Sequence, residues 1–382
     1  MPVFDGYRAF AIFGIVALHL IGIAPVPEGI VYGVGHLKTA TLAQLVDMLF
    51  IVSGFVVFLP TASRGEFGDV GKYAIRRAAR LLPAFYLILI LAYAIIRYNV
   101  TPESIAVHAI GFQTILSYFP GHGGIGFGVI APVWTLTVEI SFYIVLPFVA
   151  MAFYRRPRAG LLVAAIVTLI WIQASFHAGF LADLFGLNES TAWADRVRAA
   201  SGTQLPFWAY SFALGMIGAR IYVAVREKWP QDLIDRRAPR LLLAGLVALI
   251  LCSVLIYFSP QPADNTTLLF RVRSSPLVAI GYSTSLAVFM VALAFCSHRL
   301  QWFFANRGIR WLAEISYGVY LSHAVIMYAA VWFWGFGFPV DFREFMNYAL
   351  FVVVASIAYG YFTARYFEQP IRRYAQRFGR RA

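Results

Sequence analysis

The sequence predicts an all-α protein, a polytopic transmembrane bundle of about ten helices with both chain ends in the cytoplasm. Of its 382 residues, 60% are hydrophobic and only 13% are charged, whereas soluble domains carry about 25% charged residues. The apolar residues gather in runs of about 20, the length that crosses a bilayer. Most Lys and Arg residues fall between these runs, on the sides that the positive-inside rule assigns to the cytoplasm. No stretch is long enough for a separate soluble domain, so we treat 1–382 as one integral membrane domain.

The apolar runs predict the spans one by one, and the first is expected to stay attached as a signal-anchor because no clear cleavage site follows it. The predicted spans are 7–25, 39–60, 80–99, 134–154, 160–179, 205–226, 240–259, 277–297, 311–335 and 344–367. An eleventh segment, 103–118, is shorter and contains Glu103, His108 and Gln113. If it crossed the membrane, the basic stretch "YRRPR" would face outward. We therefore expect 103–118 to be a re-entrant or interfacial helix.

The net charge of +13 follows this membrane topology, so it does not indicate a nucleic-acid partner. Cys252 and Cys296 both lie in apolar runs, so we expect neither a disulfide framework nor a metal site. These features indicate a multi-pass membrane protein that contacts the surrounding lipids. The sequence gives no indication of the oligomeric state.

Four ionisable residues stand inside predicted spans: His19, Asp47, Glu139 and His323. A charged side chain at that depth costs about 2.5–3.5 kcal/mol, so each residue is a candidate for function. Two carboxylates and one or two imidazoles at similar depth suit proton transfer, because a carboxylate can orient an imidazole and raise its basicity. The alternative for Asp47 and Glu139 is a polar clamp between helices.

Arg8 and His19 share one helix face. Eleven residues at 100° each come within about 20° of three full turns, and they separate the two side chains by about 16 Å. Arg8 is then at the cytoplasmic mouth and His19 in the outer half of the membrane. The alternatives are an ordinary basic flank for Arg8 and a structural hydrogen bond for His19.

Arg77 and Arg80 stand three residues apart near the cytoplasmic surface, so we expect them on one helix face. The guanidinium fork suits phosphate groups. A basic flank that only sets the topology is the alternative.

Several segments resemble the acyltransferase-3 family of integral membrane acyltransferases. "FDGYRAFAIFGIVALH" is similar to the family's opening, a basic residue followed by ten residues and a histidine. Later segments of the family resemble five stretches of this sequence, in the same order: "LVDMLFIVSGFVV", the Arg-x-x-Arg pair, "PVWTLTVEISFYIVLP", "ISYGVYLSH" and "YFEQPIRR". Two positions depart from the family pattern. Tyr7 stands where leucine is usual, and Ile140 stands where a second acidic residue often follows the glutamate. The resemblance covers nearly the whole chain.

The resemblance implies an O-acyltransferase that takes an acyl group, usually acetyl, from cytosolic acyl-CoA. The implied acceptor is a hydroxyl of a carbohydrate or glycan, reached at the outer side of a bacterial cytoplasmic membrane. Many relatives carry a fused extracytoplasmic esterase-like domain that this sequence lacks. We therefore expect a stand-alone form in which the bundle itself delivers the acyl group.

The resemblance also assigns roles. We expect His19 to act as general base, oriented by Glu139 or Asp47. Arg8, Arg77 and Arg80 are expected to hold the phosphates of the coenzyme. The residues expected to contact the substrates are Ser53, Trp134, Tyr317, Tyr320 and His323.

Two alternatives stay open at this point. The transfer can pass through an acyl-enzyme on His19, Ser53 or a tyrosine instead of going directly to the acceptor. A proton-coupled transporter or flippase would also place ionisable residues inside the membrane. The absence of inverted repeats or paired broken helices in the sequence disfavours transport.

Overall fold

The computed structural model describes residues 1–22, 42–96, 102–112, 114, 118, 130–180, 197–258, 277–337 and 339–377. All regular elements within these ranges are helical, without a strand. Nine of the described helices are long and apolar enough to cross a membrane, and the apolar helix Ala279–Phe295 is shorter. These ten helices fall on the ten predicted runs. The prediction of an all-α polytopic bundle is confirmed.

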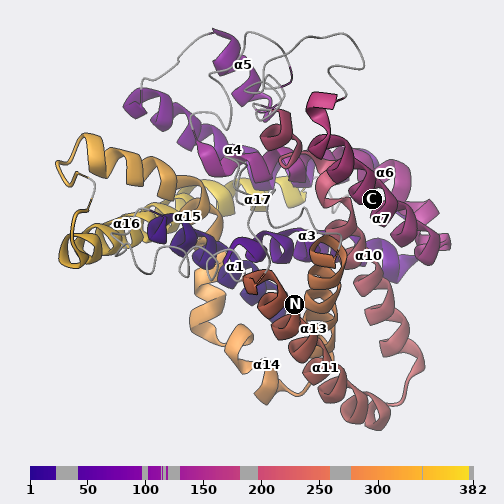
Figure 1. The fold of residues 1–382 in the computed structure, drawn as a ribbon. Helices are drawn as coiled ribbons and strands as arrows, with labels where there is room; N and C mark the ends of the chain where they lie inside the picture. The colour runs from indigo at the N-terminus through magenta and orange to yellow at the C-terminus, as the bar shows by residue number, and fades with distance from the viewer. Residues whose placement is uncertain are drawn as a thin grey trace.

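Ten long helical elements build the bundle (Figure 1). They are α1 (Pro2–Ile21), α3 (Leu45–Arg64), α4 (Val70–Ile96), α6 (Trp134–Arg155), α7 (Pro157–Phe176), α10 (Leu205–Lys228), α11 (Gln231–Phe258), α13 (Ser283–Phe295), α15 (Arg307–Trp332) and α16 (Phe342–Thr363). Shorter segments connect or extend them: η2 (Leu42–Gln44), α5 (Pro102–Ala109), η4 (Ala131–Val133), η5 (Leu277–Tyr282), α14 (His298–Ala305), η6 (Ala364–Glu368) and α17 (Gln369–Arg377). Figure 1 shows α1 and α3 near the centre, with α15 and α16 on one side and α6, α7 and α10 on the other.

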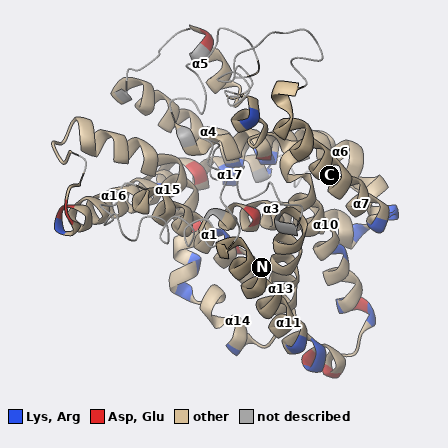
Figure 2. Ribbon diagram, in the orientation of Figure 1, with Lys and Arg blue, Asp and Glu red and all other residues tan. Residues whose placement is uncertain are grey.

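Charged residues are sparse inside the bundle. Figure 2 shows Lys and Arg gathered at the ends of α7 and α11 and near α14, with a few charges deeper, around α17 and α3. An isolated charge is costly at membrane depth, so the few deep ones mark the region to examine for function.

The segment predicted to be re-entrant or interfacial contains one described helix, α5, with eight residues. At about 1.5 Å per residue it extends about 12 Å, far less than the roughly 30 Å of a bilayer core. This length agrees with a segment that does not cross. Gln113 lies outside the described residues.

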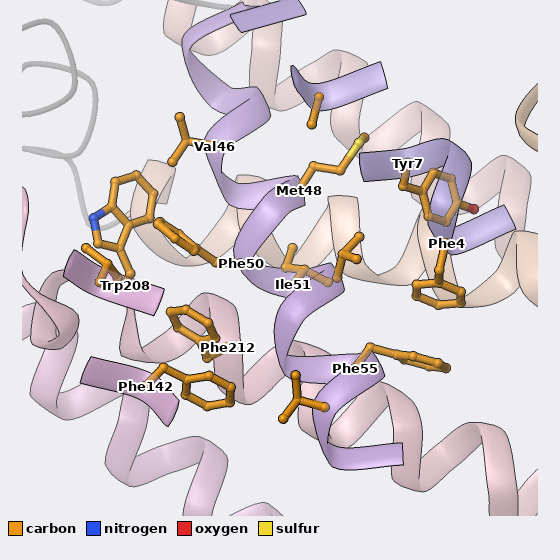
Figure 3. Close-up of a cluster of buried hydrophobic side chains, with 14 of the residues drawn as sticks. Phe4, Tyr7, Val46, Met48, Phe50, Ile51, Phe55, Phe142, Trp208 and Phe212 are labelled. Carbon is orange, nitrogen blue, oxygen red and sulfur yellow. The ribbon is translucent and has the colours of Figure 1, made fainter. Parts of the chain in front are cut away.

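Helix α3 forms the centre of the core because its sequence is apolar on all sides, as expected of a fully enclosed helix. Gly54 of α3 and Gly215 of α10 let the two helices cross closely, because a Cβ at either position would overlap the backbone of the other helix. Figure 3 shows Phe50, Trp208, Phe212 and Phe142 grouped on one side of α3, and Phe4, Tyr7 and Phe55 on the other.

Candidate active site

A cavity of about 260 Å³ lies between α1, α3, α4, α6, α15 and the segment from η6 to α17. It brings together residues that are far apart in the sequence. Its charged and hydroxyl-bearing lining residues are Asp5, Arg8, Ser53, Arg80, Thr135, Glu139, Arg310, Glu314, Tyr317, Tyr320, Glu368 and Arg372. Among the described residues, four arginines and four carboxylates line it together, and the guanidinium groups can bind a phosphate.

Arg8 is held at this cavity by two contacts. Its guanidinium donates to Asp5 Oδ1 and to the backbone carbonyl oxygen of Ala313, both at 3.4 Å. The second contact joins α1 to α15. Arg80 enters the same cavity from α4, so two of the three predicted phosphate-binding arginines lie together.

The third, Arg77, does not line this cavity in the described structure. Its guanidinium carbon lies 5.7 Å from the ring centre of Tyr73 and 5.5 Å from that of Tyr143. It borders a mostly apolar groove between α4, α5 and α6. Residues three apart on a helix differ by about 60° in direction, and this difference places Arg77 and Arg80 in separate spaces.

Glu139 lines the cavity from α6. It accepts a hydrogen bond from Ser53 Oγ at 2.7 Å and another from the hydroxyl of Tyr143. The contact with Ser53 joins α6 to α3. The predicted substrate residue Ser53 and the predicted catalytic residue Glu139 are therefore direct neighbours.

Asp47 is almost fully buried, and the described residues that line the cavity do not include it. Its Oδ1 accepts hydrogen bonds from Ser211 Oγ at 2.6 Å and Ser283 Oγ at 2.8 Å. These contacts tie α3 to α10 and α13. This geometry is the polar clamp between helices that the sequence left open as an alternative.

The two deep histidines meet. His19 Nδ1 lies 2.9 Å from His323 Nε2, and the two ring planes are nearly parallel, 16° apart, with centres 5.1 Å apart. His323 is fully buried. The sequence predicted that His323 contacts the substrate and that a carboxylate orients His19, whereas the structure places the His323 imidazole directly against His19.

The tautomers of this pair follow from its partners, and we assign them from the network. His323 Nδ1 lies 2.7 Å from the carbonyl oxygen of Tyr320, which only accepts, so this nitrogen carries the proton. Neutral His323 therefore accepts through Nε2, and His19 donates to it through Nδ1. Neutral His19 then has its lone pair on Nε2, which becomes the basic nitrogen of the pair.

Helices α1 and α15 together position Arg8 at one end of the site and the histidine pair at the other. Arg8 contacts Ala313 near their beginnings and His19 contacts His323 further along, so the helices run parallel in this region. The cavity lies on the face of α1 that presents Asp5, Arg8 and Ile12. His19 continues this face about 16 Å from Arg8.

Tyrosines border the cavity beside this face. Tyr317 and Tyr320 line it, and the Tyr320 hydroxyl lies 2.7 Å from Thr135 Oγ1 and 2.7 Å from the Pro132 carbonyl oxygen. Trp134, also predicted to contact substrate, is instead stacked with Trp208 at 5.8 Å between ring centres. It belongs to the aromatic core around α3.

The sequence of residues 2–365 matches the family model described as an acyltransferase domain. The chain belongs to this acyltransferase family. The match covers nearly all of the chain, as the motif resemblance predicts. The family and the apolar helices together make this acyltransferase an integral, multi-pass membrane protein.

Three curated relatives show what the acyltransferase resembles. It is 25% identical to "Putative peptidoglycan O-acetyltransferase YrhL" of Bacillus subtilis (strain 168), over 97% of this chain and 55% of that protein. It is 23% identical to peptidoglycan O-acetyltransferase OatA of Listeria monocytogenes serovar 1/2a (strain ATCC BAA-679 / EGD-e), over 98% and 56%. Nodulation protein 10 of Rhizobium leguminosarum bv. viciae is 23% identical, over 75% and 72%.

The acyltransferase spans about half the length of the first two relatives. No solved structure matches it. The bacterial relatives agree with the expected place in a bacterial cytoplasmic membrane.

Sequence reasoning missed five charged residues of the cavity: Asp5, Arg310, Glu314, Glu368 and Arg372. A signal for two of them was present. Arg310, Glu314, Tyr317 and Leu321 recur at helical spacing on α15, so the face that carries the predicted Tyr317 extends back to Arg310. Nothing in the spacing of the C-terminal segment indicates that it returns to the cavity.

Proposed function

We propose that this acyltransferase moves an acyl group, expected to be acetyl, from cytosolic acyl-CoA to a hydroxyl of a glycan acceptor at the outer side of the membrane. Family membership supports acyl transfer. The names of two relatives support an acetyl group and a glycan acceptor. The donor rests on the arginines of the cavity.

One observation carries the proposal: a parallel pair of helices holds a paired imidazole at one end and an arginine-lined cavity at the other. We place the phosphates of the donor at Arg8 and Arg80. Its thioester then extends toward His19, which lies about 16 Å from Arg8 along the same face of α1. The arm of coenzyme A between its phosphates and its sulfur is of similar length.

The chemistry that we propose is a direct transfer. The acceptor hydroxyl gives its proton to Nε2 of His19 while its oxygen attacks the thioester carbonyl carbon. The C–S bond then breaks, and the leaving thiolate takes the proton from the His19 imidazolium. The products are an ester and free coenzyme A. General base catalysis of this kind contributes roughly 10²–10⁴-fold.

His323 is a positioning residue in this scheme. It holds the Nδ1 proton of His19, which keeps the lone pair on Nε2 and stabilises the imidazolium as it forms. Glu139 is placed to orient the hydroxyl of Ser53 on the cavity wall, and it also accepts from the hydroxyl of Tyr143. We propose a structural role for Asp47.

Two alternatives remain as outcomes of the test. An acyl-enzyme on His19, Ser53 or a tyrosine would give a labelled protein when the acceptor is withheld. A proton-coupled transporter or flippase would move a glycan or lipid intermediate without releasing coenzyme A. Family membership favours transfer over transport.

The experiment uses the full chain in proteoliposomes with radiolabelled acetyl-CoA on the cytoplasmic side and soluble peptidoglycan fragments on the other. We expect acetyl esters on the fragments and release of coenzyme A in equal amounts. Liposomes without protein are the control. Release of no coenzyme A, with or without fragments, would contradict an acyl-CoA donor.

A further inference from the structure

The carboxylate of Glu368 occupies an unusual position in the cavity. The residue is 2% exposed and lines the cavity beside Arg8 and Arg80. Its Oε1 is buried and has no hydrogen-bond partner among the described residues. Its Oε2 lies 4.0 Å from a guanidinium nitrogen of Arg372, a long contact for an ion pair.

The backbone around Glu368 departs from a regular α-helix. Glu368 ends η6, a π-helix between α16 and α17. Pro370 lacks an N–H group, so the regular hydrogen-bond ladder cannot continue through it. Single-turn π-helices are frequent at functional sites.

An unpaired buried polar atom is costly. Leaving a buried acceptor unsatisfied costs about 1–3 kcal/mol, and more for a charged group. Such atoms are rare in folded proteins and call for an explanation. A ligand that donates a hydrogen bond to Oε1 would remove this cost when it binds.

The neighbours of Glu368 restrict the ligand. A phosphate would be repelled by the carboxylate and is better placed at Arg372, Arg8 or Arg80. Arg372 is four residues further along the chain, about 6 Å along a helix axis. In the predicted topology the chain runs inward there, so Glu368 lies about one turn deeper in the cavity than Arg372.

We propose that Glu368 Oε1 accepts a hydrogen bond from the arm of the acyl-thioester donor, at the hydroxyl or amide N–H that follows the phosphates. This inference rests on the proposed function. A hydroxyl and an amide N–H stand within a few bonds of the inner phosphate of coenzyme A, a distance that fits one helical turn. Glu368 then selects a donor that carries this arm.

The test compares three donors that differ in the parts they retain. Acetyl-CoA has the phosphates and the arm, and S-acetylpantetheine has the arm without phosphates. S-acetyl-N-acetylcysteamine keeps only the amide nearest the sulfur and lacks the phosphates, the hydroxyl and the amide N–H that follows them. The variants are Glu368→Met, which removes the acceptor at similar volume, and Glu368→Gln, which keeps an acceptor oxygen. The matched control is Glu227→Met, at an exposed residue of α10 that does not line the cavity.

We expect Glu368→Met to raise KM roughly tenfold for acetyl-CoA and for S-acetylpantetheine, the size of a hydrogen bond to a charged group. KM for S-acetyl-N-acetylcysteamine should not change, and Glu368→Gln should recover part of the loss. Arg80→Ala should show a different pattern, with its effect confined to acetyl-CoA.

Equal losses on all three donors would show that Glu368 only supports the fold, and unchanged KM on all three would show that it contacts no donor. Either result overturns the inference and leaves the proposed function intact. A wild-type protein that uses none of the three thioesters would overturn the proposed function itself.

Discussion

The contact between His19 and His323 is the smallest unit on which the account depends. One imidazole with a polar partner could be structural, but two imidazoles joined by a hydrogen bond form a directional chain that ends at a backbone carbonyl. This chain determines which nitrogen of His19 is basic. The chemistry of the site therefore depends on His323 although its side chain is fully buried.

Replacing His323 tests this dependence. His323→Leu should lower kcat roughly tenfold to a hundredfold, the range known for loss of the groups that orient metal-bound histidines. His323→Gln should retain more activity, because its amide oxygen can accept from Nδ1 of His19. The measurement is kcat and its pH profile for both variants at matched folded amounts. Equal activity of the two variants would contradict the tautomer assignment.

Asp47 provides a contrasting case at the same scale. Because Asp47 accepts from Ser211 and Ser283, Asp47→Leu should remove the acceptor of the buried Ser211 hydroxyl, whereas Ser283 can still donate to the Ala279 carbonyl oxygen. The thermal stability should fall, at about 1–3 kcal/mol for an unsatisfied buried group. Asp47→Asn should stay close to wild type, because the amide oxygen still accepts. Thermal inactivation in detergent measures both. A folded Asp47→Asn protein without transfer activity would instead support the catalytic role predicted from the sequence.

At the scale of elements, α4 contributes side chains both to the cavity and to the apolar groove between α4, α5 and α6. Arg80 faces the cavity and Arg77 faces the groove beside Tyr73 and Tyr143. The sequence placed both on one face because they are three residues apart. It could not show that Arg77 lies against the ring of Tyr143, since Tyr143 belongs to another helix.

The two arginines therefore differ in a testable way. Arg80→Ala should raise KM for acetyl-CoA, and Arg80→Lys should restore it only in part because an ammonium cannot reproduce the guanidinium fork. Arg77→Ala should leave this KM within about twofold, since Arg77 does not line the cavity. Steady-state kinetics with acetyl-CoA distinguishes the two. A larger effect at Arg77 than at Arg80 would show that the donor does not bind in the cavity.

Elements also show what a sequence can predict. Hydropathy and length identified the ten long helices, and the eleven-residue spacing correctly placed Arg8 and His19 along one face of α1 against α15. Arg372 and Glu368 could not be found in this way. Their position depends on a π-helix and on the return of the C-terminal helix to the cavity, and periodicity within one helix carries no information about either.

At the scale of the whole molecule, the proposed transfer requires a cavity that opens to the cytoplasm and a histidine pair in the outer half of the membrane. This orientation follows from the predicted topology. The first test introduces single cysteines after Cys252→Ala and Cys296→Ala. Arg156→Cys marks the predicted cytoplasmic turn between α6 and α7, and Val340→Cys the exposed turn before α16.

A membrane-impermeant maleimide added from outside to intact cells should label Val340→Cys and leave Arg156→Cys unlabelled until the cells are opened. The measurement is the labelled fraction before and after permeabilisation. Labelling of Arg156→Cys in intact cells would reverse the orientation and place the arginine-lined cavity on the wrong side for a cytosolic donor.

The most direct test of the central claim is single-turnover acyl transfer by His19→Gln with acetyl-CoA already bound. We expect the rate of transfer to fall by roughly 10²–10⁴-fold while donor affinity changes little, because a general base acts in the transition state. His177→Gln, at an exposed histidine outside the cavity, is the control and should transfer at the wild-type rate. A correctly inserted His19→Gln protein that still transfers at a near-normal rate would contradict the claim that His19 is the base.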